Sequence, residues 1–324
     1  MIQRVTQTSR RRFAVVVNLV LLLLILGTVV SAQDIELAIV YTDSLTSTLR
    51  TIRGIKSSIN QQQSNIQFHE YLLTSSPSEI EEKVSEINEL DPRLILTVGS
   101  FVTQEISERI KNKPIIFSAV LNPETSGFVK SKNNPGGMIT GASLDIPPNI
   151  QYKYFKRVIS DLKKVGVLYS DETANLIPPA KVVASGLGLE LIAVKIDSEK
   201  DIPGALEKLQ RTTDGIWSVA DKKIFSPRST RFILLNTLRN GIPFMGFSRN
   251  LVESGALFAL DFDYKDIGRQ TGKIALNVLS GGNPARIKVE VPGIIWFHYN
   301  EKTAKHINVD VPEDLVAIAK EVYR

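Results

Sequence analysis

Short hydrophobic runs alternate with longer amphipathic stretches along most of the chain. The runs have the length of strands, and the stretches between them repeat apolar positions at helical spacing. A first series of predicted strands covers residues 35–40, 66–73, 94–98 and 115–117, and a second covers residues 165–169, 189–194, 215–219 and 243–247. This alternation is typical of βαβ units, so we predict an α/β fold with doubly wound, mostly parallel sheets.

Two helix starts have clear signals. Ser76, Pro77 and Glu79 match a capping box with proline at the first helical position, and apolar residues follow at helical spacing. Ser226 and Pro227 start a helix of the second series in a similar way. We therefore predict that helices begin at both places.

The two series end their strands alike. The first strand of each series ends in tyrosine, a hydroxyl residue and aspartate, at residues 41–43 and 169–171. The fourth strand of each follows a proline and ends in serine, at Ser118 and Ser248. Because the elements also come in the same order, we predict two similar lobes.

The remaining segments indicate how the lobes connect. Residues 121–148 are rich in proline, glycine and asparagine, which favours a crossover around a short β-like stretch at 138–144. Beyond the second series, we predict a strand at 256–262, a helix at 263–279, a turn at 281–284, strands near 288–291 and 294–297, and a final helix at 312–323. The expected domains are residues 33–120 with 263–290 for lobe 1, and residues 121–262 with 291–324 for lobe 2. Several crossings between them would form a multi-strand hinge.

The first 32 residues have the layout of a secretory signal peptide. Arg4 and residues 10–12, all arginine, precede an apolar run at 13–30, and the small-residue site Val30-Ser31-Ala32 follows. We expect cleavage after Ala32 and a periplasmic protein, by an export route that the residues leave open. The apolar run is also long enough to span a bilayer, so an uncleaved anchor remains an alternative.

The net charge of +5 reflects 39 basic against 34 acidic residues. Four of the basic residues are the arginines at positions 4 and 10–12, and without them the chain has one more base than acids. The body is therefore close to neutral, which removes the main support for nucleic-acid binding.

The chain lacks the residues or motifs that several kinds of site require. The chain has no cysteine, which excludes disulfides, thiolate metal sites and a lipidated cysteine. Its three histidines, at positions 69, 298 and 306, do not have the spacing of a metal site. No phosphate-binding loop, dinucleotide-binding glycine motif or serine-hydrolase elbow occurs, so we expect no cofactor and no catalysis.

The ends of the predicted strands carry groups suited to binding a small molecule. In open α/β sheets, ligands lie beyond the carboxyl ends of parallel strands, near the N–H groups of helix N-termini. Small hydroxyl, acidic, aromatic and glycine residues occur there. They are Tyr41, Thr42, Asp43, Ser44, Gly99, Ser100, Ser118, Tyr169, Ser170, Asp221, Phe247 and Ser248.

Asp221 is the strongest of these candidates. It follows the apolar run 216–220, where a carboxylate suits a ligand ammonium group better than a core. Capping of the following helix is the alternative role for the hydroxyl and aspartate residues. Trp217, inside the same run, is expected in the core.

The chain resembles the substrate-binding proteins of ABC transporters, and among them the tryptophan/tyrosine-type branch. The resemblance rests on the order of several short segments. They are Val98-Gly99-Ser100, Pro114-Ile115-Ile116-Phe117-Ser118, Asn122-Pro123, Gly127, the stretch from Pro135 to Gly141, Gly255-Ala256-Leu257, Gly268, Tyr299-Asn300 and Val311-Pro312-Glu313-Asp314-Leu315. It implies a type I periplasmic-binding architecture, in which the lobes close over a ligand and deliver it to a membrane permease.

The chain departs from the family pattern near the expected ligand. The pattern has an aspartate at the place of Asn122, an asparagine at that of Met138, and Thr-Asp-Asn at residues 220–222, which here are Ala-Asp-Lys. The chain therefore keeps the carboxylate of Asp221, while its neighbours differ.

These observations lead to a functional hypothesis with two alternatives. We expect a monomeric periplasmic binding protein that takes an amino acid or a related amine or aromatic compound, with an ABC permease as partner. A ligand-sensing protein that acts on a signalling partner is the first alternative. A secreted enzyme that uses Asp43, Asp171 and Asp221 is the second.

Overall fold

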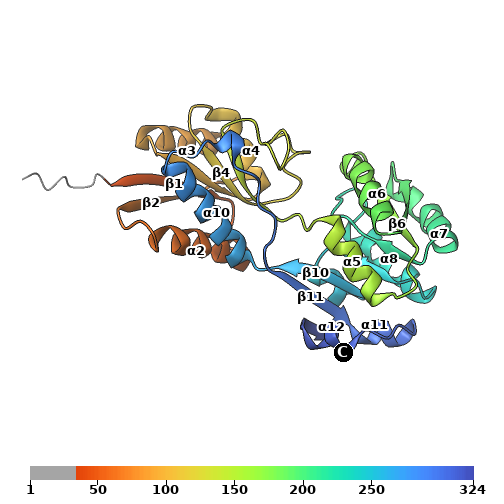
Figure 1. Ribbon diagram of the computed structural model, residues 1–324. Helices are drawn as coiled ribbons and strands as arrows, with labels where there is room; N and C mark the ends of the chain where they lie inside the picture. Colours follow the sequence, from red (N-terminus) through yellow and green to blue (C-terminus); the bar gives the residue numbers. More distant parts are fainter. Residues whose placement is uncertain (1–33) are drawn as a thin grey trace, which may run out of the picture.

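The computed structural model describes residues 34–324, and they form two α/β lobes side by side (Figure 1). The expected signal peptide and its cleavage site lie outside the described residues. Within residues 34–324, no helix has the length and apolar character needed to cross a membrane. The two-lobed α/β fold with parallel strands confirms the predicted fold class.

The first lobe contains a five-stranded sheet in the order β2-β1-β3-β4-β5, with every neighbouring pair parallel. Its strands are β1 (Ile35–Tyr41), β2 (Ile66–Leu72), β3 (Leu94–Val98), β4 (Ile115–Val120) and β5 (Ile139–Ser143). Leu37 and Ile39 of β1 belong to the core on one face, and Ala38 and Val40 to the core on the other. Burial on both faces explains the continuous apolar run of this strand.

Four helices cover this sheet: α2 (Thr46–Asn60), α3 (Pro77–Leu90), α4 (Ser100–Arg109) and α10 (Tyr264–Leu279). Helices α2 and α10 lie against each other, far apart in sequence but adjacent in Figure 1. Their backbones meet at glycines: a Cβ atom on Gly54 would lie 2.2 Å from the carbonyl oxygen of Lys265. The contact therefore requires residues without a side chain.

The second lobe contains a seven-stranded sheet in the order β12-β11-β10-β9-β8-β6-β7. Its strands are β6 (Lys164–Tyr169), β7 (Glu190–Lys195), β8 (Gly215–Trp217), β9 (Phe244–Gly246), β10 (Phe258–Phe262), β11 (Ile295–Asn300) and β12 (Ala319–Tyr323). Strands β10 and β11 are antiparallel, and the other pairs are parallel. The helices are α5 (Pro148–Val158), α6 (Ile177–Gly186), α7 (Ile202–Thr212), α8 (Pro227–Arg239), α9 (Arg249–Glu253), α11 (Glu301–His306) and α12 (Glu313–Ala317), with short 3₁₀ turns η1 (Ala174–Leu176) and η2 (Glu199–Asp201). A third 3₁₀ turn, η3 (Pro284–Arg286), contacts β5 of the first lobe.

The expected boundary between the lobes at residue 120 is corrected by β5. Residues 139–143, expected in lobe 2, pair with β4 at the edge of the first sheet. Gly141 permits this pairing, because a Cβ atom there would lie 2.0 Å from the carbonyl oxygen of Phe117. The first crossing to lobe 2 therefore follows β5.

Two predicted elements near the C-terminus are also corrected. Residues 288–291 form no strand and contribute one isolated bridge, between Ala142 and Glu290. The expected helix at 312–323 ends at Ala317, and residues 319–323 form β12, parallel to β11. The edge of β11 provides a strand partner for this segment, and tertiary context decides its conformation.

The helix caps differ from each other. Ser226 accepts a hydrogen bond from the backbone N–H of Ser229, which confirms the predicted start of α8. Ser76 makes no such bond, and Glu79 instead accepts from the hydroxyl of Thr74 at 2.5 Å. The capping box predicted at Ser76 was therefore wrong, although the helix begins at Pro77 as expected.

Three segments connect the lobes. The chain passes from β5 to α5, returns between β10 and α10, and crosses again between η3 and β11. At the rim between the lobes, the amide of Asn175 donates to the hydroxyl of Thr125 at 2.6 Å. This bond joins the two lobes outside the connecting segments.

Candidate functional site

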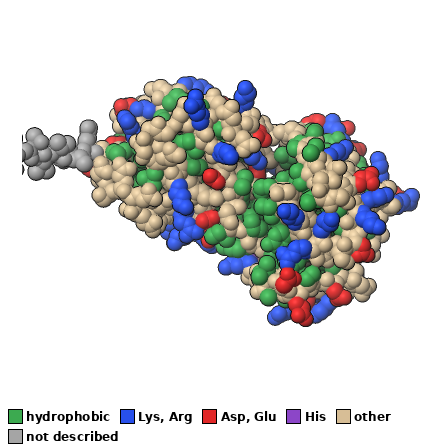
Figure 2. All heavy atoms as spheres, viewed as in Figure 1, with side chains coloured by type: hydrophobic (Ala, Val, Ile, Leu, Met, Phe, Trp, Pro, Cys, Tyr) green, Lys and Arg blue, Asp and Glu red, His purple; other side chains and the backbone are tan. Residues whose placement is uncertain are grey.

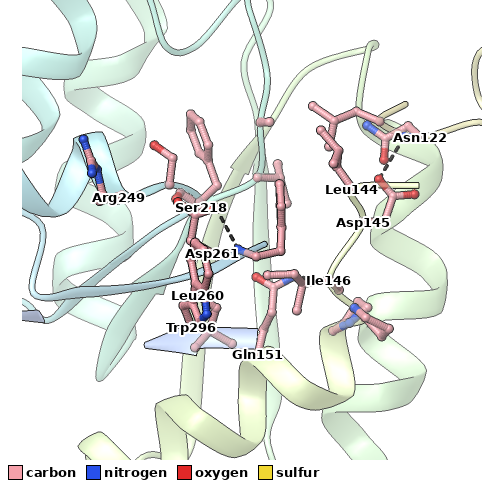
Figure 3. A pocket seen from close by; sticks show the side chains of 18 of the residues that line it. Asn122, Leu144, Asp145, Ile146, Gln151, Ser218, Arg249, Leu260, Asp261 and Trp296 are labelled. Carbon is pink, nitrogen blue, oxygen red and sulfur yellow. Dashed lines mark hydrogen bonds between the residues drawn. The ribbon is translucent and has the colours of Figure 1, made fainter. Parts of the chain in front are cut away.

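A cavity of about 870 Å³ lies between the lobes and is lined by both of them. Figure 2 shows hydrophobic side chains gathered beside the notch where the lobes meet. The wall includes Thr46, Ser47 and Arg50 of α2, residues 144–148 between the lobes, and residues 217–220, 247–250 and 260–262 of the second lobe. In Figure 3, Asn122 and Asp145 lie on one side of the cavity and Ser218 and Arg249 on the other.

Trp296 of β11 lies beside two cations at the hinge end of the cavity. The guanidinium of Arg50 is 5.8 Å from the centre of its ring, and the ammonium of Lys320 is 4.7 Å from it. Arg50 is held in place by Asp263, whose Oδ1 is 2.8 Å from its Nη2. Since Arg50 belongs to lobe 1 and Lys320 to lobe 2, this aromatic side chain contacts both lobes.

Trp217 lies on the second-lobe side of the cavity. It is almost fully buried, and its ring meets that of Tyr152 edge to face, with the ring centres 5.2 Å apart. Its indole N–H donates to Oε1 of Gln151 at 2.7 Å. The side chain thus belongs to the core, as predicted, and also forms part of the cavity wall.

A cluster of charged side chains occupies one face of β10, β11 and β12. In the sheet, Asp261 is opposite Trp296 and His298 is opposite Glu321. Arg249 of α9 pairs with Glu321, with Nη1 and Oε1 3.1 Å apart. Among the described residues, neither ring nitrogen of buried His298 finds a hydrogen-bond partner.

The pKa values in this cluster are set mainly by burial. Desolvation raises the pKa of Asp261, although the backbone N–H of Phe262 and the charge of His298 partly oppose it. Desolvation lowers the pKa of His298, against the opposite effects of Asp261 and Glu321; Arg249 and Lys320 add to the lowering. Both effects favour neutral side chains at this place.

We expect His298 to make the protein less stable in mild acid. Its pKa is lower in the folded state than the value of about 6.5 of an unfolded chain, so the unfolded chain binds the proton first as the pH falls. Stability is then lost as the pH drops below about 6.5 toward the folded-state pKa. The raised pKa of Asp261 has the opposite effect on stability, because here the folded protein binds the proton first as the pH falls. This effect occurs at lower pH, near the pKa range of an aspartate.

Melting temperatures between pH 7.5 and 5 check this prediction. His298→Gln is expected to flatten the loss of stability, whereas the exposed His306→Gln should keep the wild-type slope. Equal slopes for all three proteins would show that His298 does not take up this proton.

Two of the predicted site residues, Phe247 and Ser248, line the cavity. Phe247 meets Phe225 edge to face, with ring centres 5.0 Å apart. Ser248 immediately precedes α9, and its side chain makes no capping bond. Its hydroxyl is therefore available to a bound molecule.

Asp221, for which the sequence predicts contact with a ligand ammonium group, lies in this structure among the loops behind the cavity wall. The side chain is buried and does not line the cavity. Its carboxylate accepts from the N–H of Ser170 at 2.9 Å, the hydroxyl of Thr173 at 2.6 Å and the N–H of Lys223 at 3.0 Å. It joins the loops that follow β6 and β8.

The other candidates of the second lobe also lie away from the cavity. Ser170 is fully buried beside Asp221, and its hydroxyl accepts from the N–H of Glu172 at 3.2 Å. Tyr169 packs partly buried against the core. Both side chains serve the packing of the loop after β6.

The first-lobe candidates lie at the carboxyl edge of their sheet but outside the cavity wall. Ser118 is buried, and its hydroxyl bonds that of Thr271 in α10 at 2.8 Å. Asp43 accepts from Thr48 at 2.7 Å and from the N–H of Leu45 at 2.9 Å, within its own turn. The rest are half-buried Tyr41 and Thr42, exposed Ser44 and Ser100, and Gly99, whose φ of 102° precedes α4.

Sequence reasoning missed Arg50, Asp261 and Trp296. Trp296 falls in a run that was read only as a strand, and Arg50 lies on a helix rather than at a strand end. Asp261 gave a signal that could have been used, because an acidic residue interrupts the apolar run 256–262. A charge inside such a run often marks a functional position.

The chain matches known proteins over nearly its whole described length. The family model described as "ABC transporter substrate binding protein" matches residues 36–323. A tyrosine-binding protein of Clostridioides difficile (strain R20291) is 26% identical over 223 residues, which cover 67% of this chain and 63% of that relative. The alignment thus leaves more than a third of the relative unmatched.

Solved structures share the fold. The ligand-free, open structure of a substrate-binding protein with adhesive properties from Clostridium difficile has a TM-score of 0.72 at 19% identity. The superposition covers 89% of this chain and 99% of the other chain. An ABC domain in complex with L-Trp from Streptococcus pneumoniae has a TM-score of 0.63 at 22% identity. The superposition covers 90% of this chain and 100% of that domain. At less than 25% identity, these likenesses show a shared fold.

The family match spans both lobes and the three connecting segments, including the strands whose ends form the cavity wall. The two-lobed arrangement is that of type I periplasmic binding proteins. The chain is therefore a member of the ABC transporter substrate-binding protein family.

Proposed function

We propose that this protein binds a small molecule in the cavity between its lobes and delivers it to the permease of an ABC importer. The observation that carries the proposal is the composition of the cavity wall. Both lobes and the connecting segments contribute to it, so a molecule bound there can contact the two parts that move when the lobes rotate. A ligand that contacts both lobes stabilises the closed state by its differential affinity.

The proposed ligand is an amino acid or a related amine or aromatic compound. Trp217, Phe247 and Trp296 provide aromatic surfaces in the wall, and Ser47 and Ser248 provide hydroxyl groups. The volume of about 870 Å³ exceeds that of one amino acid, which leaves room for the lobes to approach each other. The tyrosine-binding relative and the L-Trp complex point to the same class of ligand.

The proposed location follows from the sequence. The basic and apolar segment at 1–32 has the pattern of an export signal, and a near-neutral body follows it. Export to the periplasm would bring the protein to the outer side of an inner-membrane permease. We propose that it acts there as a monomer.

A ligand screen tests the proposal. The purified protein is melted with amino acids, amines, purines, vitamins and sugars. A compound at one hundred times its dissociation constant should raise the free energy of unfolding by about 2.7 kcal/mol. A screen without any stabilising compound contradicts the binding function, and chemical conversion of a stabilising compound contradicts the non-enzymatic one.

A further inference from the structure

Asp261 is a carboxylate in the cavity wall that has no cation of its own. It lies near the end of β10, half-buried, and one of its oxygens accepts from the N–H of Phe262 at 2.8 Å. Among residues 34–324, no lysine or arginine lies within ion-pair distance of it. A carboxylate in this position retains an uncompensated charge.

The cations of the wall are committed to other groups. Three of the four cations form ion pairs with carboxylates other than Asp261. These pairs are Arg50 with Asp263 at 2.8 Å, Lys132 with Asp145 at 2.7 Å and Arg249 with Glu321 at 3.1 Å. The fourth, Lys320, lies over the ring of Trp296. Among the described residues, Asp261 therefore has no ion-pair partner in the wall, although the charge of Arg249 and its backbone N–H lower the pKa of Asp261.

Partial burial makes this charge costly. Desolvation raises the pKa of Asp261 and outweighs the favourable effects of the Phe262 N–H, His298 and Arg249. An ammonium group placed beside the carboxylate would return the lost electrostatic energy. The site thus favours a cation that comes from outside the chain.

The surroundings of Asp261 suit an amine attached to an aromatic or apolar body. Trp296 lies opposite it in the neighbouring strand, and Phe262 and Tyr264 follow it with their rings edge to face, 5.2 Å apart. Aromatic faces attract cations and also cover flat apolar groups. Leu260, on the preceding position, adds an apolar surface to the same wall.

We propose that Asp261 binds the protonated amine of the ligand and makes the cavity selective for amine-bearing compounds over their des-amino counterparts. This inference rests on the proposed function of the cavity. In this proposal the ammonium group meets Asp261 instead of Asp221, whose carboxylate accepts three hydrogen bonds within the chain. Asp261 is a specificity-determining residue in this scheme.

Paired ligands test the inference by isothermal titration calorimetry. The amine-bearing probes are L-tyrosine and L-tryptophan, and their counterparts are 3-(4-hydroxyphenyl)propionate and indole-3-propionate. The wild-type protein should bind the amino acid roughly ten- to hundredfold more tightly than its counterpart. Asp261→Asn should remove most of that preference, mainly by lowering the affinity for the amino acid.

Control variants separate charge from folding. Asp310→Asn removes an equal charge from an exposed position outside the cavity wall and should keep the wild-type preference. Asp261→Ser is a second neutral variant in case the asparagine disturbs the strand. Melting temperatures of both variants without ligand show that the fold is kept.

The outcomes distinguish this inference from the proposed function. Amino-acid binding with an undiminished preference in Asp261→Asn overturns the role of Asp261 and leaves the binding function intact. A saturable ligand without an amine, found in the wider screen, does the same. If no compound of any class binds the wild-type protein, the proposed function fails, and the inference fails with it.

Discussion

Gly268→Ala is expected to lower the free energy of unfolding by about 3 kcal/mol. A Cβ atom at this position of α10 would lie 2.0 Å from the carbonyl oxygen of Thr51 and 3.0 Å from the Cα atom of Gly54. Both are backbone atoms of α2, so no side chain can turn aside to make room. Overpacking of a rigid contact typically costs 1–3 kcal/mol, and this one is at the upper end because two helices must separate.

Gly204→Ala is the matched control. Gly204 lies in α7, and a Cβ atom there would have no neighbour within 4 Å. Alanine at a helical position without a clash is expected to stabilise by up to about 1 kcal/mol. Urea unfolding of both variants measures the difference, and equal effects would contradict the close contact between α2 and α10.

Asp221→Ala is expected to cost about 3 kcal/mol as well. The substitution leaves two backbone N–H groups and the hydroxyl of Thr173 without their buried acceptor. Each unsatisfied buried donor costs about 1–3 kcal/mol, and water entering the space recovers part of this. The loops after β6 and β8 should therefore loosen together.

The neighbouring Asp171 provides the control for Asp221. Its side chain is 65% exposed and pairs with Lys195 at 2.9 Å, an interaction that solvent screens. Asp171→Ala should leave the unfolding midpoint in urea nearly unchanged. A small effect of Asp221→Ala, or a specific loss of ligand binding in a fully stable Asp221→Asn protein, would return Asp221 to the ligand site.

Much of the fold could be predicted because its signals are local. The apolar runs of β1, β3 and β4 are buried on both faces of a sheet, so each appears in the sequence as an uninterrupted hydrophobic segment. The repeated tyrosine, hydroxyl and aspartate at residues 41–43 and 169–171 marks equivalent positions in the two lobes. Here the local pattern and the tertiary structure agree.

The errors occur where distant strands decide the structure. Residues 319–323 form a strand because β11 offers them an edge, which a reading of residues 312–323 alone does not contain. Residues 139–143 join the first sheet because Gly141 allows close approach to Phe117. Neither partner can be identified from spacing within the segment itself.

The candidate site was predicted only in part, because local signals mark the ends of strands but not the distant segments that pack on them. Phe247 and Ser248 follow a buried strand and do line the cavity, as the rule for open α/β sheets predicts. Asp221 also follows a strand, but its carboxylate accepts three hydrogen bonds from the loops after β6 and β8. Trp296 reaches the cavity from β11, a strand of the second lobe whose partner β10 lies more than thirty residues earlier in the chain.

The central claim is that the two lobes close over a small molecule held between them. Small-angle X-ray scattering with saturating L-tyrosine or L-tryptophan, chosen by the larger melting shift, tests this most directly. The account predicts a smaller radius of gyration in the ligand-bound protein and no change with a compound that does not bind. Saturable binding with an unchanged radius of gyration would contradict it.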